Sequence, residues 1–210
     1  MQLMGKAVRF AVAMGAVALS AVSAQAQFSF VGSTRGCFFG AFNGTTTCTP
    51  GSGPTAIGAG AGSLSFSEST FEAMAVDGIA SFNTSDNNFG NFTLLTGNRN
   101  FAGNGFVLEF LVTSPAEANG LMSALLTGRV RSNNASSVFI DFDNNEWTLL
   151  DPASAGISAR VTDLAVRTGT SNFVNGQLMG SVVPEPSTYA LMGTGLVGLL
   201  GVALRRRRSA

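Results

Sequence analysis

Carboxylates are the most concentrated reactive groups of this sequence, and they gather in residues 141–146. Asp141 and Asp143 are two positions apart, so in an extended strand their side chains share a face, about 7 Å from each other. Glu146 and two asparagines complete the stretch. Two such carboxylates could serve glycoside hydrolysis, or bind Ca²⁺ together with amide oxygens. We favour a third interpretation, a solvated hairpin face, because the stretch lacks the turn glycine of an acidic calcium loop.

Two residue types that serve many active sites are almost missing. The sequence has no histidine, and Lys6 is its only lysine. Histidine is the commonest general base and metal ligand, and lysine is required for Schiff bases and phosphate-binding loops. Catalysis by Ser-His-Asp or Cys-His is therefore excluded. We expect no catalytic residues, no cofactor and no bound metal, and assign the body of the chain a non-enzymatic role.

The first 26 residues have the three parts of a secretory signal peptide: a basic start, an apolar run over residues 10–19 and an A-x-A cleavage site. The basic residues are Lys6 and Arg9, and the cleavage site consists of Ala24, Gln25 and Ala26. Cleavage is expected to leave Gln27 as the mature N-terminus. The chain that follows is then exported.

The C-terminal segment combines an apolar stretch with basic residues. From Ser187 to Leu204 no residue is charged, and a helix of this length spans about 27 Å, close to the hydrocarbon thickness of a bilayer. Four arginines follow at once: Arg205, Arg206, Arg207 and Arg208. Because basic flanks stay on the cytoplasmic side, both ends of the chain are expected inside and everything between them outside. Pro184-Glu185-Pro186 precedes the apolar stretch as an extended peptide.

This order of Pro-Glu-Pro, short apolar helix and arginine cluster resembles the PEP-CTERM sorting signal of bacterial proteins associated with exopolysaccharide. The resemblance covers residues 183–210. It implies a bacterial host and processing by exosortase, a membrane-embedded cysteine peptidase. Pro184, Glu185 and Pro186 would be the recognition residues, the helix would hold the protein in the cytoplasmic membrane, and the arginines would stop transfer. After processing, the resemblance implies a location at the cell surface or outside the cell.

Cys37 and Cys48 are the only cysteines. An even pair that lies close in the sequence of an exported protein is expected to be oxidised. A disulfide that closes a loop of about 12 residues stabilises a fold by roughly 3 kcal/mol in the chain-entropy model. We therefore predict a Cys37–Cys48 disulfide.

Residues 27–183 lie between the two terminal signals, enough for one domain with a core and too few for two. They contain six arginines against eleven acidic residues, which leaves a formal net charge of −5. An acidic surface does not favour a nucleic-acid partner, whose phosphates bind basic residues. We divide the chain into a signal peptide (1–26), an extracytoplasmic domain (27–183) and a sorting signal (184–210) that contains a transmembrane helix (187–204).

The pattern of the domain is that of β-strands. Gly105 to Thr113 alternates apolar and mixed positions with period two and gives the clearest strand. Further strands are expected over residues 28–31, 62–66, 70–76, 79–82, 92–96, 125–131, 138–142, 147–150, 157–167 and 177–183. Their spacing, with Gly and Asn in the turns, is typical of an antiparallel β-sandwich or jelly roll.

Two local features depart from this pattern. Residues 115–126 indicate a short helix or turn, since Ser114 could cap it and Glu117 falls in its first turn. Asn144-Asn145 indicates a two-residue hairpin turn, because Asn tolerates positive φ.

Aromatic residues are the last source of functional hypotheses. Sixteen of the 17 phenylalanines lie between residues 28 and 173, and most are expected in the core. An aromatic platform for sugars is the alternative, and the exposure of Phe38, Phe39, Phe42 and Trp147 distinguishes the two. We expect an exported surface or matrix protein with a structural or adhesive domain. The alternatives are a carbohydrate-binding module, whose partner would be exopolysaccharide, and, less favoured, a secreted polysaccharide hydrolase.

Overall fold

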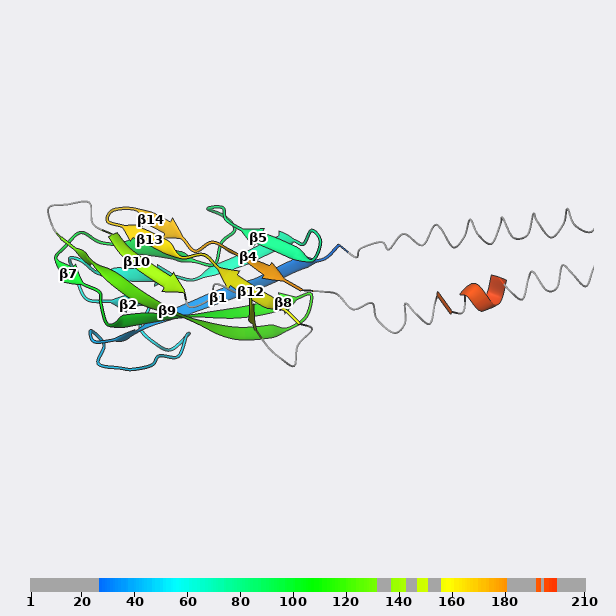
Figure 1. The fold of residues 1–210 in the computed structure, drawn as a ribbon, viewed down its shortest axis with the longest axis horizontal. Coiled ribbons are helices and arrows are strands. Elements are labelled where there is room, and N and C mark those ends of the chain that lie inside the picture. Colours follow the sequence, from blue (N-terminus) through cyan, green and yellow to red (C-terminus); the bar gives the residue numbers. More distant parts are fainter. Residues whose placement is uncertain are drawn as a thin grey trace, which may run out of the picture.

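The computed structural model describes residues 27–131, 137–142, 147–150, 156–180, 192–193 and 195–199. Residues 27–180 form a mainly β domain, in which every ladder between named strands of the described chain is antiparallel (Figure 1). In chain order the strands are β1 (Ser29–Gly40), β2 (Ala56–Ile57), β3 (Leu64–Ser67), β4 (Ser69–Met74), β5 (Ile79–Phe82), β6 (Asn91–Leu94), β7 (Arg99–Asn100), β8 (Asn104–Ser114), β9 (Ala118–Val130), β10 (Ser137–Phe142), β11 (Thr148–Leu149), β12 (Ser158–Val161), β13 (Leu164–Arg167), β14 (Ser171–Phe173) and β15 (Gly176–Met179). The expectation of a mainly antiparallel β fold is confirmed.

The largest sheet has seven strands in the order β13-β10-β9-β8-β1-β4, with β7 paired to β9. Its long strands β1, β8 and β9 cross the domain from end to end (Figure 1). The sheet is curled along their length. In β10, Val138, Ile140 and Phe142 are buried and the residues between them are exposed. We call the buried side of this sheet its inner face and the other side its outer face.

Two four-stranded sheets cover the inner face, in the orders β14-β6-β3-β2 and β11-β12-β15-β5. Ring contacts join the layers. Phe92 of β6 lies 4.9 Å from Phe106 of β8, and Phe82 of β5 lies 5.1 Å from Phe71 of β4, between ring centroids. The domain therefore has three sheets in two layers, and the large sheet forms a curled half-barrel. Of the expected sandwich or jelly roll, the mainly β, antiparallel character is confirmed.

The large sheet passes into a small sheet at each of its edges. At one edge Asp77 and Gly78 form a two-residue turn between β4 and β5, with φ of 52° and 80°. Positive φ at both positions is the property of a type I′ hairpin turn. At the other edge Leu94 of β6 bridges Thr168, the residue after β13. The two small sheets are thus connected to opposite edges of the large sheet and continue its curl.

Phenylalanine rings fill the space between the layers. One group surrounds Phe106, at centroid distances of 4.9 Å each, and consists of Phe38, Phe66 and Phe92. A second group surrounds Phe89, at 4.7 to 5.3 Å, and consists of Phe71, Phe82 and Phe110. All of these rings are almost completely buried. Most phenylalanines of the described chain are core residues, as expected.

Strand β1 makes room for these rings with two glycines on its inner face. A Cβ atom on Gly36 would overlap the ring of Phe106, and one on Gly32 would lie 2.6 Å from the Phe71 ring. Between the glycines, the buried hydroxyl of Thr34 donates a hydrogen bond of 2.9 Å to the carbonyl oxygen of Phe89. The inner face of β1 is therefore shaped to receive aromatic side chains from both layers.

Cys37 of β1 and Cys48 form a disulfide, which confirms the sequence-based prediction. Their sulfur atoms are 2.06 Å apart and their Cα atoms 6.1 Å apart. Gly53 passes close by, and a Cβ there would lie 2.9 Å from the Cβ of Cys37. The disulfide attaches the loop that follows β1 to the outer face of that strand.

The expected helix or turn over residues 115–126 is wrong for most of its length, because β9 begins at Ala118. Ala118, Met122 and Ala124 are buried, and exposed residues lie between them, which is strand periodicity. The Ala, Leu and Met of this segment favour helices, but nine residue pairs with β8 outweigh that local preference. Only residues 115–117 form a turn.

The other expected strands agree in place, with altered ends. The strand of residues 105–113 lies within β8, and the strand of 28–31 is the start of β1, which continues to Gly40. The strand expected over 157–167 is divided into β12 and β13. The Asn144-Asn145 turn lies outside the described residues.

The terminal signals lie mostly outside the described residues. The signal peptide, residues 1–26, lies outside the described chain, as does most of the expected transmembrane segment, residues 187–204. Residues 192–193 and 195–199 are helical. Within the described ranges, no helix has both the length and the apolar character that crossing a bilayer requires.

Gly36→Ala should destabilise the domain by about 1–3 kcal/mol, because the added methyl group overlaps a Phe106 ring held by three other rings. Urea denaturation measures this free energy of unfolding. Ser33→Ala, on the outer side of the same strand, is the matched control and should change it by no more than about 0.5 kcal/mol. Equal stability of Gly36→Ala and the parent would contradict the described packing.

Thiol labelling of the denatured, unreduced protein should detect no free cysteine, because Cys37 and Cys48 are bonded to each other. Replacing both by serine should lower the free energy of unfolding by roughly 3 kcal/mol. Labelling at both positions would show that the loop is held in another way.

Candidate functional site

The carboxylate pair expected at residues 141 and 143 is only half described. Asp141 lies exposed on the outer face of β10 and pairs with Leu125 of β9. Asp143 and Glu146 lie outside the described residues. In the part of the chain that the structure describes, no three His, Cys, Asp or Glu side chains gather as a metal site.

The aromatic residues singled out from the sequence differ in exposure. Phe38 is completely buried, Phe39 and Trp147 are half-buried, and Phe42 is 43% exposed. The Cζ atom of Arg99 lies 4.9 Å from the centroid of the Phe42 ring, a cation–π contact. Of the four candidates, Phe42 is therefore the most exposed.

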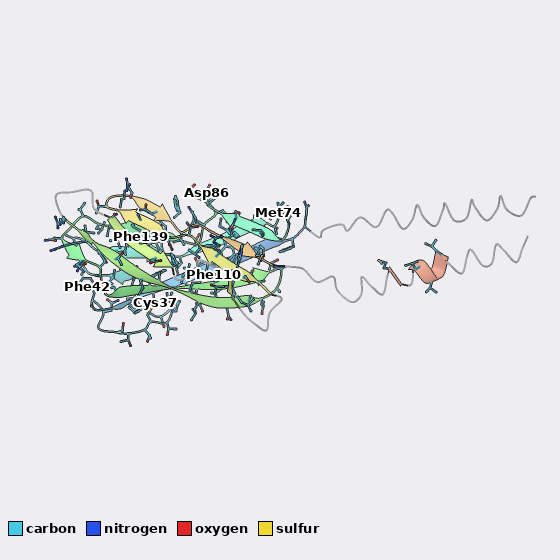
Figure 2. The ribbon with its side chains drawn as sticks, viewed as in Figure 1. Cys37, Phe42, Met74, Asp86, Phe110 and Phe139 are labelled. Atoms are coloured by element: carbon cyan, nitrogen blue, oxygen red, sulfur yellow. A yellow bond between two sulfur atoms is a disulfide. The ribbon has the colours of Figure 1, made fainter. Side chains whose placement is uncertain are left out.

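Sequence analysis missed a second exposed aromatic residue, Phe139 of β10, which is 42% exposed. The signal was present, since residues 137–142 alternate with period two and Val138, Ile140 and Phe142 are apolar. That alternation places Phe139 on the same face as Asp141. Phe42 lies at the end of the domain opposite to Met74, and Phe139 lies in the same half as Phe42 (Figure 2).

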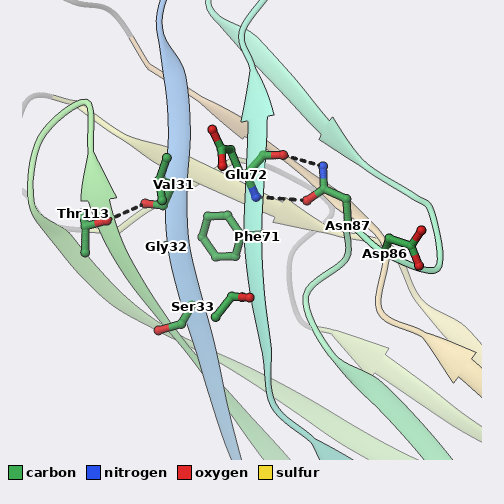
Figure 3. A pocket seen from close by; sticks show the side chains of 9 residues that line it. Val31, Gly32, Ser33, Phe71, Glu72, Asp86, Asn87 and Thr113 are labelled. Atoms are coloured by element: carbon green, nitrogen blue, oxygen red, sulfur yellow. Dashed lines mark hydrogen bonds between the residues drawn. The ribbon is translucent and has the colours of Figure 1, made fainter.

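A shallow groove of about 470 Å³ lies over the outer side of β1 and β4 (Figure 3). Hydroxyl groups of Ser33, Thr70 and Thr113 and the carboxylate of Glu72 line it. Between Val31 and Ser33, Gly32 also lines the groove. Such a lining offers donors and acceptors for a hydroxyl-rich ligand.

Asn87 closes one side of the groove by completing the edge of β4. Its side-chain oxygen accepts a bond of 3.2 Å from the amide of Glu72, and its side-chain nitrogen donates a bond of 2.8 Å to the Glu72 carbonyl oxygen. The amide group thus occupies the place that a neighbouring strand would take. This part of the β4 edge is satisfied within the domain.

Glu72 and Asp86 are the two acids of the groove, but their carboxylates do not face each other. Figure 3 shows them on opposite sides of β4, with Asn87 between. Glycosidases place two carboxyl groups on either side of one glycosidic bond. The groove therefore fits binding of polar groups better than carboxylate-catalysed hydrolysis.

The two ends of the described domain lie together. Gly180 donates a backbone hydrogen bond of 3.0 Å to Gly78, and a Cβ on Gly180 would lie 3.2 Å from the Phe30 ring near the start of β1. Both ends leave from the same side of the domain (Figure 1). Strand β7 and Phe42 lie at the far side (Figures 1 and 2).

Comparison with known proteins identifies the segment that follows. Residues 182–208 match the PEP-CTERM protein-sorting motif. No protein of curated function and no solved structure matches the chain. The resemblance drawn from the sequence is thereby confirmed, and the motif supports an exported protein that exosortase processes.

The sorting and cleavage residues themselves have no described structure. Pro184, Glu185 and Pro186 and the arginines Arg205, Arg206, Arg207 and Arg208 fall within the matched motif. Ala24 and Ala26 precede the described chain, and Gln27 is its first, exposed residue. Their roles in cleavage and sorting remain predictions.

Asn87→Ala should expose the β4 edge, because it removes both hydrogen bonds to the backbone of Glu72. Amide hydrogen exchange at Glu72 should then accelerate about fivefold to tenfold. Asp86→Ala is the matched control, since Asp86 bonds to Ser85 rather than to β4. Unchanged exchange at Glu72 in Asn87→Ala would show that the edge is protected by other means.

Proposed function

We propose that this chain is a bacterial surface or extracellular-matrix protein whose β domain has a structural or adhesive role and no catalytic one. After export, the helix of residues 187–204 holds the protein in the cytoplasmic membrane, with Arg205–Arg208 inside the cell. An exosortase then cleaves near Pro184-Glu185-Pro186. The domain is released or transferred to the cell surface.

The observation that carries this proposal is the position of the sorting motif. It begins at residue 182, two residues after Gly180, whose backbone is still bonded to the Asp77-Gly78 turn. The motif therefore follows the domain without a long linker. Its far side, with Phe42 and Arg99, is directed away from the membrane while the motif is embedded. This orientation suits a domain that makes contacts outside the cell.

The side chains support a non-catalytic domain. The mature chain has no histidine and no lysine, and both cysteines are in the disulfide. General acid–base and nucleophilic chemistry would have to rely on carboxylates, hydroxyls and arginines. In the groove, the carboxylates of Glu72 and Asp86 point apart (Figure 3).

Carbohydrate binding is the second candidate function, favoured by specific surface features. Phe42 and Phe139 expose aromatic rings, and the groove beside β4 presents hydroxyls and two carboxylates. Aromatic faces and convergent polar groups are common features of sugar sites. An adhesive domain that binds the polymer of the matrix would unite both functions.

In a host with exosortase, the intact mass of the mature protein should correspond to a chain that starts at Gln27 and lacks Arg205–Arg208. Replacing Pro184-Glu185-Pro186 by alanines should leave the full tail in place and keep the protein in the membrane fraction. A mature species that retains the arginines in the unmodified chain would refute sorting by exosortase.

The non-catalytic assignment is tested with a panel of polysaccharides. The purified protein should bind without releasing reducing sugars. Turnover that is lost in Asp141→Asn or Asp143→Asn, both of which keep the side-chain shape, would instead establish the hydrolase alternative.

A further inference from the structure

The outer face of the large sheet carries two exposed arginines in the half away from the chain ends. Arg129 is near the end of β9, and Arg167 is the last residue of β13. Strand β10 lies between β9 and β13. The Cα atoms of the two arginines are therefore separated by two strand spacings, about 10 Å. Neither guanidinium group forms an ion pair with a described residue. Two cations thus face solvent without a counter-charge from the described chain.

Phe139 lies on the same face, in β10, between the strands of the two arginines. Its cross-strand neighbours are Thr127 of β9 and Ala165 of β13. Both neighbours are small, and the Phe139 ring is 42% exposed. Along β10, Ser137 precedes it and Asp141 follows it on the same face. The ring therefore forms a low platform with basic groups toward one end and a carboxylate toward the other.

We propose that this face of β9, β10 and β13 binds a polysaccharide that carries carboxylate groups, such as a polymer of uronic acids. The proposal rests on the surface or matrix role proposed above and specifies the ligand of that role. Arg129 and Arg167 bind the carboxylate of a sugar unit through charge-assisted hydrogen bonds. The apolar face of a pyranose ring stacks on Phe139. Asp141 accepts hydrogen bonds from the hydroxyl groups of the next unit.

The charge of the surrounding surface favours such a polymer over nucleic acid. Nucleic acids present one phosphate per nucleotide and are bound by many basic contacts, whereas this face has two arginines beside Asp141. A polymer with one carboxylate per sugar, separated by neutral hydroxyls, matches the alternation of basic, aromatic and acidic groups across the face.

The location also suits a polymer outside the cell. Gly180, which precedes the sorting motif by two residues, lies at the opposite end of the domain from β7, and β7 pairs with β9 at Asn100 and Arg129. The C-terminal end of the described domain and strand β7, which pairs with β9 at Arg129, are therefore at opposite ends (Figure 1). A long chain can reach the face while the tail is embedded.

Binding of the full-length protein, purified in detergent micelles, to polygalacturonate tests the proposal by isothermal titration calorimetry. The double variant Arg129→Gln/Arg167→Gln should weaken binding about tenfold or more, and Phe139→Ala about fivefold. Arg160→Gln is the matched control, an exposed arginine on β12 of a small sheet, and should bind as the parent does. Thermal unfolding of each variant verifies that it is folded.

Two further probes identify the recognised chemistry. Fully methyl-esterified polygalacturonate, which has the same sugar without the charge, should bind about tenfold more weakly or not at all. Equal binding of both polymers, unchanged affinity of the double variant, or tighter binding of double-stranded DNA would overturn the proposal. The double variant should still be processed at its C-terminus, so a failure of binding is distinguished from a failure of sorting.

Discussion

The fold depends on the contact between strand β1 and the phenylalanine rings that lie on it. Gly32 and Gly36 leave space that Phe71 and Phe106 fill, and the side chain of Thr34 binds the backbone at Phe89. Because β1 pairs with both β4 and β8, the same strand fixes the hydrogen-bonded layer and the packing of the second layer. A larger residue at either glycine would separate the layers, since close-packed interiors have little free volume.

Because the core lies on the inner face of the large sheet, the outer face does not pack against the second layer. The disulfide fastens the loop after β1 over Cys37, and Asn87 completes the edge of β4. The remainder of that face, on β9, β10 and β13, keeps exposed groups of both charges around Phe139. A rigid sheet with a varied, solvent-facing surface is a suitable scaffold for binding an extended ligand.

Sequence patterns predicted the strands whose burial alternates, such as β8 and β10, and the disulfide, which followed from export and cysteine count. They failed for β9, where Ser114, Pro115 and Glu117 imitate the start of a helix while the strand is specified by pairing with β8. The Asp77-Gly78 turn carries a strong hairpin signal that was overlooked. The inner glycines of β1 could not be interpreted, because their purpose depends on rings that are distant in sequence. Exposure of Phe139 follows from period two, whereas the absence of an ion pair between Arg129 or Arg167 and any described residue requires the folded sheet.

The position of β15 has a mechanical consequence. This strand leads directly to the sorting tail and lies between β12 and β5, with four residue pairs on each side. If the far end of the domain were held, a pull on the tail would be directed along the strands, and the hydrogen bonds of both ladders would be loaded together in shear. Such a geometry resists tension better than one in which bonds open one after another. Tension on this strand would therefore be shared between its ladders with β12 and β5.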